Sequence, residues 1–172
     1  METIHLIRLS AESDLPFLAA VERDAARIYD RHVGRDSSHT DKTLAPDILL
    51  ASHKNKSLWV AEEAAALIAF LAATKTGEAL HIEEISVAFD HQGRGVGEQL
   101  VTTLLCAAKN SACKYISLTT DRSLPWSRNF YRKLGFQECR VENCSADLTN
   151  ILLRDKEISP VPENRIAMIL SV

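Results

Sequence analysis

The stretch Asp90-His91-Gln92-Gly93-Arg94-Gly95-Val96-Gly97-Glu98-Gln99-Leu100 holds three of the six glycines in the chain. It lies between a run of residues typical of a β-strand and a run with the apolar spacing of an α-helix. Glycines let the backbone turn tightly and let successive N–H groups point at one anion, and the following helix adds partial positive charge at its N-terminus. The stretch is therefore predicted to be a loop that binds phosphate.

Two common phosphate loops do not fit the spacing of these glycines. The dinucleotide fingerprint requires a third glycine where Glu98 or Leu100 stands, and the P-loop requires Gly-Lys-Ser or Gly-Lys-Thr after its gap. A kinase or dehydrogenase would also need a catalytic lysine or a ribose-binding acid after a first strand, and these glycines come too late in the chain for that. A nucleotide site of either type is therefore disfavoured.

The spacing that does fit is Gln92-x-x-Gly95-x-Gly97, directly after an expected strand. This pattern resembles the pyrophosphate-binding motif of the GNAT superfamily, the acyl-CoA-dependent N-acetyltransferases. Further along the chain, the segment Pro125-Trp-Ser-Arg-Asn-Phe-Tyr-Arg-Lys-Leu-Gly-Phe136 resembles the Phe-Tyr-x-x-x-Gly-Phe helix and strand of the same superfamily. Two motifs in this order and at this spacing identify the chain as similar to that superfamily.

The resemblance implies acetyl-CoA as co-substrate. No metal is expected, because the loop supplies amide donors and the sequence has no cluster of metal ligands. The backbone amides from Gly93 to Glu98 suit the pyrophosphate, and Arg94 is either a charge-assisted contact or a solvated loop arginine. The strand before the loop is expected to offer its backbone to the pantetheine arm, although its side chains can simply pack. The expected cofactor-binding residues are Ile85, Ser86, Val87, Gln92, Gly93, Arg94, Gly95, Val96, Gly97, Glu98 and Ser127.

Tyr131 is the expected catalytic acid. A phenol with a pKa of about 10 can protonate an adjacent thiolate whose conjugate acid has a pKa near 8.5 or somewhat higher. The resemblance places the tyrosine of this helix there. Many family members carry asparagine about two helical turns earlier, where this chain has Leu124 and Pro125. Ser127, one turn before Tyr131, is the candidate to replace that contact with the carrier.

Glu83 and Glu84 are the candidates for the base that removes a proton from the attacking amine. Because they are adjacent on a strand, their side chains point to opposite faces, and only one can face the reaction. The resemblance favours Glu83 and leaves Glu84 core-facing or paired. His81 is a further candidate as an auxiliary base. A His-x-Glu pair without a third ligand is weak evidence for a metal, so a hydrogen-bonded strand histidine is the favoured interpretation.

Alternating and helical patterns of apolar residues outline the rest of the chain. Strands are expected at residues 3–9, 57–62, 66–74, 79–89, 115–120, 136–141 and 165–172. Helices are expected from a cap at Ser13 or Asp14 through Ile28, at 46–53, from Val96 through Ala108, from Pro125 to Gly135 and at 145–153, with a polar loop over 30–42 and an extended linker over 155–164. This order resembles the GNAT fold and implies an α/β (α+β) class with a mixed, mainly antiparallel central sheet flanked by helices, in a single domain spanning 1–172.

Composition narrows the class of protein. A chain of 172 residues with 46% apolar content fills one core, and a net charge of −3 without a basic run argues against nucleic acid as a partner. With neither a signal peptide nor a membrane-spanning stretch, a soluble cytoplasmic protein is expected. The cysteines form no Cys-x-x-Cys pair and are expected to be reduced, with Cys106 on the apolar side of its helix.

We therefore expect an N-acetyltransferase that moves the acetyl group of acetyl-CoA to a primary amine by direct attack, with a glutamate or a water-relayed base and a tyrosine acid. The acceptor is either a small molecule or a peptide amine, and residues 30–42 and Trp126 are expected to shape the site that binds it. The sequence leaves open whether the protein forms a homodimer. The alternative is a non-catalytic acyl-CoA-binding sensor or partner module. The presence of both Tyr131 and Glu83 favours the enzyme.

Overall fold

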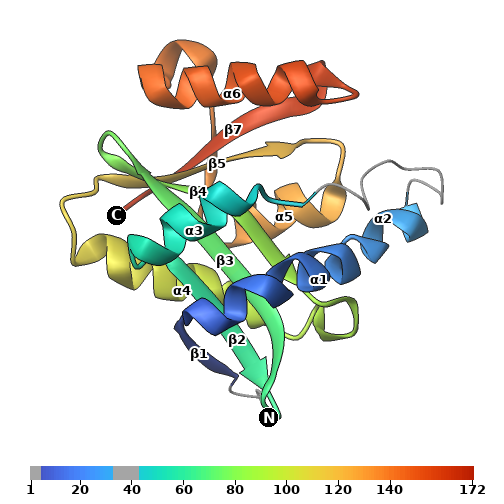
Figure 1. Cartoon of the computed structure of the whole chain (residues 1–172). Coiled ribbons are helices and arrows are strands. Elements are labelled where there is room, and N and C mark those ends of the chain that lie inside the picture. Colours follow the sequence, from blue (N-terminus) through green and yellow to red (C-terminus); the bar gives the residue numbers. More distant parts are fainter. Residues whose placement is uncertain (1–4, 33–42) are drawn as a thin grey trace. The chain divides into compact units, whose positions relative to one another are not determined.

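A computed structural model describes residues 5–32 and 43–172 (Figure 1). Its strands are β1 (Leu6–Leu9), β2 (Leu58–Glu63), β3 (Ala66–Thr76), β4 (Ala79–Val87), β5 (Tyr115–Asp121), β6 (Gln137–Cys139) and β7 (Arg165–Ser171). Its α-helices are α1 (Leu15–Ala25), α2 (Arg27–His32), α3 (Pro46–Lys54), α4 (Val96–Lys109), α5 (Pro125–Lys133) and α6 (Ala146–Ile158). Short 3₁₀ helices are η1 (Glu12–Asp14), η2 (Phe89–His91), η3 (Val141–Asn143) and η4 (Pro162–Asn164).

Hydrogen bonding joins the strands in the order β1-β2-β3-β4-β5-β7-β6. The pairs β1–β2, β2–β3, β5–β7 and β6–β7 are antiparallel, whereas β4 and β5 are parallel. The parallel pair is linked through α4, because parallel neighbours need a crossover connection. The expected mixed, mainly antiparallel sheet flanked by helices is confirmed.

The chain divides into two compact units. Unit 1 comprises Met1–Thr74 with Glu83–Leu104, and unit 2 comprises Lys75–Ile82 with Leu105–Val172. The single domain over 1–172 stays a prediction. Among the helices in the described parts of both units, none combines the length and the apolar character needed to span a membrane.

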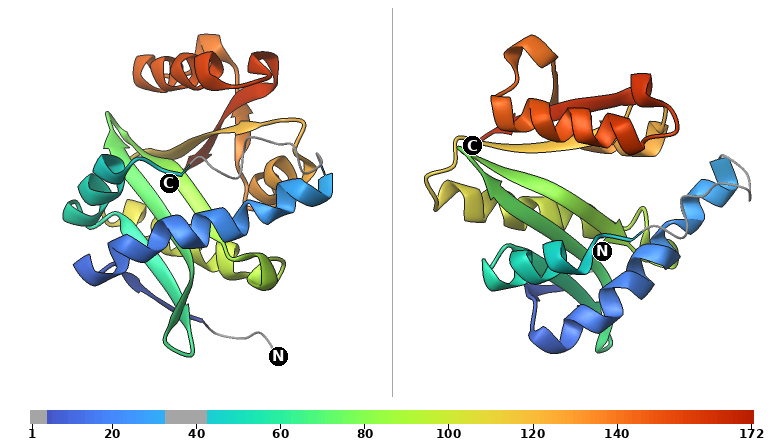
Figure 2. Two further views of the ribbon diagram at one scale, coloured as in Figure 1. Left: turned by 45° about the vertical axis from the view of Figure 1, so that its right-hand side comes forward. Right: turned by 45° about the horizontal axis from the view of Figure 1, so that its top comes forward.

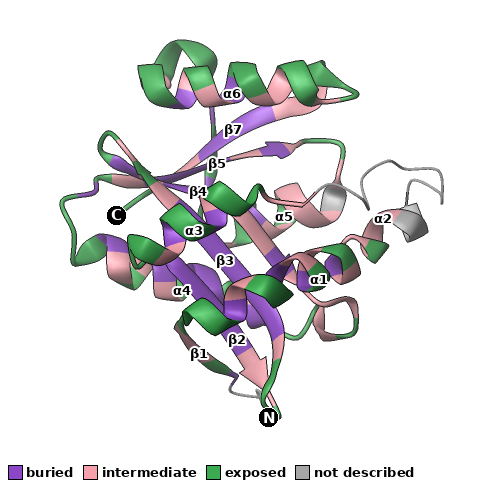
Figure 3. Ribbon diagram, viewed as in Figure 1, coloured by how far each residue is buried: buried purple, intermediate pink, exposed green. Residues whose placement is uncertain are grey.

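Unit 1 is built on β2 and β3. Apolar side chains of α1 and α3 pack on one face of these strands, and Figure 2 shows the start of α4 on the opposite face. The core consists of Leu18, Val21, Leu49, Leu58, Val60, Phe70 and Ala72, and Figure 3 shows the buried middle of β3. The helix expected through Ile28 ends at Ala25, because it is interrupted before α2, and its buried residues are Leu18, Val21 and Ala25.

Two alanines form the turn between β2 and β3. Ala64 and Ala65 have φ angles of 49° and 64°, the left-handed region that a two-residue hairpin of this kind requires at both positions. Glycine or asparagine is the usual residue there, and this turn has neither. The turn therefore carries little sequence signal, although the strands on both sides were predicted.

Unit 2 is built on β5, β6 and β7. Helix α6 packs on them through Leu148 and Leu152, which contact Cys139 and Ala167, and both views of Figure 2 show α6 running alongside β7. Ser145 caps α6, because its side chain accepts a hydrogen bond from Leu148 N at 3.2 Å. A helix over residues 145–153 was predicted from the sequence.

The end of α6 corrects two expectations. The helix continues beyond Leu153 to Ile158, and Pro162–Asn164 is a 3₁₀ turn, so residues 155–164 are not an extended linker. The run at 154–157 is charged throughout, which a search for apolar spacing does not register, and Asp155 within it bonds to Thr119 and Arg165. The helix ends just before Pro160, as expected for the residue that precedes a proline.

Two other boundaries and the orientation of one side chain differ from expectation. The strand expected at 79–89 ends at Val87, because Phe89–His91 turns into η2. Of the polar loop expected at 30–42, residues 30–32 belong to α2 and residues 33–42 lie outside the described chain. Cys106 is exposed rather than apolar-facing, since it lies two residues from the buried Leu104 and hence on the other side of α4.

Candidate active site

The predicted phosphate loop connects η2 to α4 in unit 1. Gly93 and Gly95 have φ angles of 73° and 83°, a conformation that other residues rarely adopt. A Cβ at Gly93 would meet nothing within 4 Å, and one at Gly95 would meet only Gln99 Nε2, at 4.0 Å. The loop thus opens to free space at the N-terminus of α4, where the first helical N–H groups lack partners in their own helix.

Side chains and backbone of neighbouring elements hold the loop from behind. Asp24 Oδ2 accepts a hydrogen bond from Phe89 N at 2.8 Å. The side-chain amide of Gln92 donates to the carbonyl oxygens of Ala25 at 3.1 Å and Val87 at 2.9 Å. The Gln92 amide therefore anchors the loop to the end of α1 and the end of β4.

The two glutamates of β4 have separate partners in unit 1. Thr74 Oγ1 donates to Glu83 Oε1 at 2.5 Å, while Ser86 Oγ donates to Glu84 Oε1 at 2.8 Å. Glu84 and Ser86 lie two residues apart and share a side of the strand, so Glu83 points to the other side. The expectation of opposite faces is confirmed, and the Glu83 carboxylate is oriented by a neighbouring strand.

A third carboxylate lies beside the loop. Glu63, the last residue of β2, forms a 2.8 Å contact between its Oε2 and Nε2 of His91, and its Oε1 is 3.9 Å from Nδ1 of His5. The hydrogen bond with His91 is the main cause that lowers the pKa of Glu63, with added attraction from His5 and Arg94. The Glu63 carboxylate therefore interacts electrostatically with Arg94 of the loop.

Tyr131 lies on α5 in unit 2 and is 7% exposed. Its ring makes edge-to-face contacts with Phe130 and Phe136, at centroid distances of 5.1 and 5.5 Å. Gly135 ends the helix with φ 93°, and a Cβ there would be 3.3 Å from Leu170 Cδ1. The Phe-Tyr-x-x-x-Gly-Phe motif is thus a packed unit that fixes the tyrosine ring.

Two more residues predicted from the sequence are hydrogen-bonded within unit 2. Ser127, one turn before Tyr131, has its hydroxyl 2.6 Å from that of Thr120. His81 is 2% exposed, and its Nδ1 is 2.9 Å from Ser117 Oγ, which confirms the interpretation as a hydrogen-bonded strand histidine. Across residues 5–32 and 43–172, no group of three or more His, Cys, Asp or Glu side chains is placed to hold a metal.

Sequence reasoning missed Asp24, Glu63 and the paired side chain of His91. Their contacts join residues 65 and 28 positions apart, and no short spacing pattern signals such pairs. The residues that it did identify fall in both units: the β4 glutamates and the glycine loop in unit 1, Ser127 and Tyr131 in unit 2.

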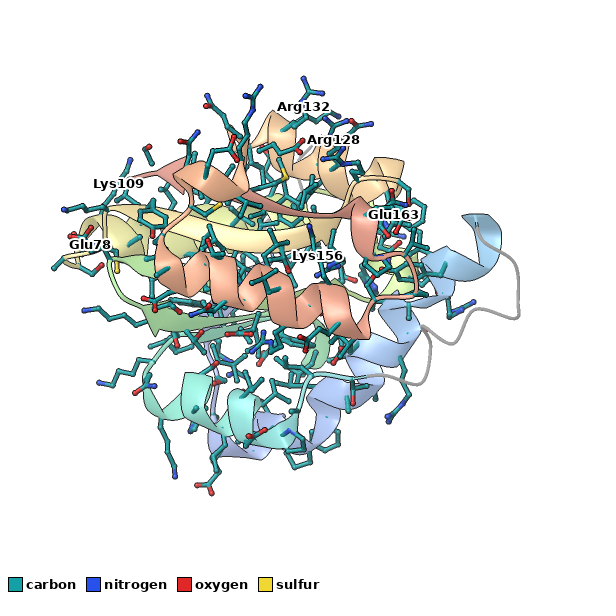
Figure 4. All side chains as sticks on the ribbon, turned by 90° about the horizontal axis from the view of Figure 1, so that it is seen from above. Glu78, Lys109, Arg128, Arg132, Lys156 and Glu163 are labelled. Carbon is teal, nitrogen blue, oxygen red and sulfur yellow. The ribbon has the colours of Figure 1, made fainter. Side chains whose placement is uncertain are left out.

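Two surface hollows lie on unit 2. The smaller adjoins the predicted residues, since Arg128 follows Ser127 and the Phe136 ring contacts that of Tyr131. One, of about 260 Å³, is lined by Arg128, Arg132, Phe136, Gln137, Glu138 and Met168. The other, of about 430 Å³, includes Lys156 and Glu163 in its lining. Figure 4 shows the four labelled charged residues of these hollows on α5, α6 and η4. Neither lining contains Tyr131 or Ser127.

Comparisons with known proteins find a family model, a relative and solved structures that are similar to this chain. Residues 19–136 match the model of the Acetyltransferase (GNAT) family. Over 66 residues the chain is 38% identical to glucosamine 6-phosphate N-acetyltransferase of Candida albicans, and this match covers 38% of the chain and 42% of that protein. The match therefore spans less than half the length of that relative.

Solved structures share the fold at low sequence identity. PaiA N-acetyltransferase from Thermoplasma acidophilum, in complex with coenzyme A, has a TM-score of 0.73 at 15% identity, over 99% of this chain and 100% of that one. N-acetylglutamate synthase from Neisseria gonorrhoeae, complexed with coenzyme A and N-acetyl-glutamate, has a TM-score of 0.70 at 14% identity, over 99% of this chain and 36% of that one. Ribosomal-protein-S18-alanine N-acetyltransferase from Escherichia coli has a TM-score of 0.68 at 18% identity, over 98% and 94%.

Proposed function

The chain belongs to the acetyltransferase (GNAT) family of acyltransferases, and from this premise we propose that it moves the acetyl group of acetyl-CoA to a primary amine. The observation that carries the proposal is the loop before α4. Its two left-handed glycines leave free space at a helix N-terminus, which suits the pyrophosphate of coenzyme A. The family match runs through residues of both units, which supports a single acetyltransferase domain.

The loop and strand β4 bind different parts of acetyl-CoA. The amides from Gly93 to Glu98 bind the pyrophosphate, and the exposed Arg94 adds a charge-assisted contact. The backbone of Ile85–Val87 binds the pantetheine arm. Anchoring of the loop by Asp24 and Gln92 supports this role, because a loop fixed in advance loses less entropy when it binds an anion.

The chemical step is a direct transfer. The amine nitrogen attacks the thioester carbonyl carbon, a C–N bond forms, and the C–S bond breaks. Glu83, oriented by Thr74, takes a proton from the amine directly or through water. Tyr131, oriented by its aromatic neighbours, gives a proton to the departing thiolate. The products are an amide and free coenzyme A.

The acceptor is proposed only as a class. Three of the relatives are named for glucosamine 6-phosphate, N-acetylglutamate and an alanine of ribosomal protein S18. All three names imply an amine nitrogen as the site of acetylation. A primary amine, small or at a peptide terminus, is therefore the acceptor proposed for this chain.

The test is a panel of amines incubated with acetyl-CoA, with release of the free thiol of coenzyme A as the readout. Tyr131→Phe should retain coenzyme A affinity and lower kcat by about 100-fold or more, since the ring stays and the proton donor is lost. Glu83→Gln should lose most activity at mildly acidic pH and recover partly as free amine increases. Binding of coenzyme A without thiol release for any amine would favour the non-catalytic acyl-CoA-binding module.

A further inference from the structure

Three side chains from separate elements of unit 1 lie close together next to the predicted phosphate loop that precedes α4. His5 precedes β1, Glu63 ends β2, and His91 lies in η2, two residues before Gly93. The Glu63 carboxylate lies between the two rings, at 2.8 Å from His91 and 3.9 Å from His5. His5 is 5% exposed, and both of its ring nitrogens are buried without a hydrogen-bond partner, as is Nδ1 of His91.

The negative charge of Glu63 is unfavourable for a loop that binds an anion. An uncompensated carboxylate next to the loop repels phosphate, and it attracts the same Arg94 that the phosphate would attract. A charged His91 removes both effects, because it cancels the charge of Glu63 at hydrogen-bond distance. A neutral His91 keeps the hydrogen bond but leaves one net negative charge behind the loop.

We propose that the Glu63–His91 pair sets the affinity of the loop for the phosphates of coenzyme A, with His91 as a positioning residue that neutralises Glu63 and leaves Arg94 available to the ligand. This inference rests on the proposed function, in which the loop binds coenzyme A. Neither residue is assigned a contact with the carrier, so both act through the loop.

The proposal predicts a pH dependence. The charged groups that face the pair are His5 from the start of unit 1 and Arg94 from the loop, while Asp24 and Arg27 beside η2 pair with each other at 3.0 Å. Imidazole is the side chain whose charge responds to physiological pH, so a histidine can cancel a carboxylate charge only when it is protonated. Wild-type affinity for coenzyme A should therefore be higher at about pH 6 than at about pH 8, relative to a variant that lacks Glu63.

The experiment is calorimetric titration of the full chain with coenzyme A at about pH 6 and about pH 8. At the lower pH, His91→Gln should raise Kd about five-fold, because the Glu63 charge is then unpaired. Glu63→Gln should bind at least as tightly as wild type. The double variant Glu63→Gln/His91→Gln should return to within about two-fold of Glu63→Gln, a rescue that a purely structural role of His91 does not predict.

Two further variants complete the test. His91→Lys keeps a charge that does not titrate in this range, so its Kd should stay near the wild-type value at both pH values. Glu12→Gln removes an exposed charge elsewhere in unit 1 and should leave Kd unchanged. Coenzyme A binding without rescue in the double variant overturns this inference alone, whereas absence of binding by the wild type overturns the proposed function and this inference with it.

Discussion

Gly95 must satisfy two demands at one position, a left-handed backbone and an open path to a bound anion. Gly95→Asp and Gly95→Asn have nearly the same shape and backbone cost but differ by one charge. We expect Gly95→Asn to raise the Kd for coenzyme A about ten-fold and Gly95→Asp about 100-fold or more, since the carboxylate repels pyrophosphate.

Calorimetry with coenzyme A measures both variants, and a thermal melt of each confirms the fold. A chelator added to the wild-type titration should leave its Kd unchanged, because the amides and not a cation are proposed to bind the phosphates. Equal Kd values for the Asp and Asn variants would mean that no anion binds at this loop.

The cysteines differ sharply in reactivity at the level of single thiols. Cys106 is exposed, whereas the Cys144 sulfur is 2.9 Å from that of Cys139. Burial, followed by the contact with Cys139, raises the pKa of Cys144 to about 12. Because the thiolate is the reactive form, iodoacetamide at about pH 8 should alkylate Cys106 at least about ten-fold faster than Cys144.

Peptide mapping by mass spectrometry follows this reaction over time. Cys106→Ser should remove the fast phase and leave the slow one. Faster labelling of Cys144 than of Cys106 would contradict the geometry of the pair.

Single residues were predictable where the backbone alone dictates the choice. Gly95 and Gly135 were expected at a turn and a helix end because few other residues adopt positive φ there. The bond between Glu63 and His91 was not predictable, because it joins distant elements and either residue is ordinary on a surface. The roles of Tyr131 and Glu83 came from a family resemblance and stay predictions.

Among the elements, the turn between β3 and β4 offers the sharpest test. Gly77 has φ 57°, and a Cβ there would lie 2.8 Å from Oδ2 of the exposed Asp147 on α6. Gly77→Ala should lower the free energy of unfolding by about 1–2 kcal/mol, mainly through the left-handed backbone.

Urea denaturation of Gly77→Ala measures this loss. Because the Asp147 side chain can rotate away, the same substitution in an Asp147→Ala background should cost the same within about 0.5 kcal/mol. A much smaller loss in that background would show that the steric contact, and not the backbone, causes the effect.

Element boundaries were predictable where apolar periodicity coincides with the element. Helix α4 and strands β2 and β3 follow their apolar residues closely. The end of α6 did not follow them, because residues 154–157 are charged and Asp155 bonds to Thr119 and Arg165, contacts that apolar periodicity does not register. The alanine turn at 64–65 was hard to predict for a related reason. The strands on either side, and not the two alanines themselves, impose its left-handed backbone conformation.

At the scale of the whole molecule, stability in acid depends on the Arg8 network. Arg8 Nη1 donates to Asp14 Oδ2 at 2.7 Å, and Arg8 Nε donates to Glu62 Oε1 at 2.7 Å. The bond from Arg8 is the main cause that lowers the pKa of Asp14. A carboxyl with a lowered folded-state pKa stabilises the protein above its unfolded-state pKa, and that contribution is lost as the pH falls through the folded value.

Asp14→Asn should therefore cost about 2 kcal/mol at neutral pH and much less at about pH 3, so that its stability curve converges with the wild-type curve. Urea denaturation at a series of pH values measures both. Glu22 acts in the opposite sense, since burial raises its pKa, so Glu22→Gln is the matched control whose curve should approach the wild-type curve in acid from the more stable side. Parallel curves for Asp14→Asn and wild type would contradict the prediction.

The order of the strands in the sheet could not be predicted from the periodicity of apolar residues. Residues 165–171 were predicted as a strand, but their insertion between β5 and β6 depends on pairings between segments far apart in the chain. The family resemblance, and not the pattern of apolar residues, implied the mixed sheet.

Strand β1 lies at one end of the sheet order and spans only Leu6–Leu9. Leu6 and Leu9 are 61% and 43% exposed, so this edge offers an apolar template to which a strand of another molecule can add. Arg8 places a charge in the middle of that template, held there by Asp14 and Glu62. When acid protonates Asp14, the guanidinium loses one of its two tethers, and we expect self-association through β1 to begin before global unfolding does. We therefore expect solubility of the concentrated protein and its resistance to acid to depend on the same arginine.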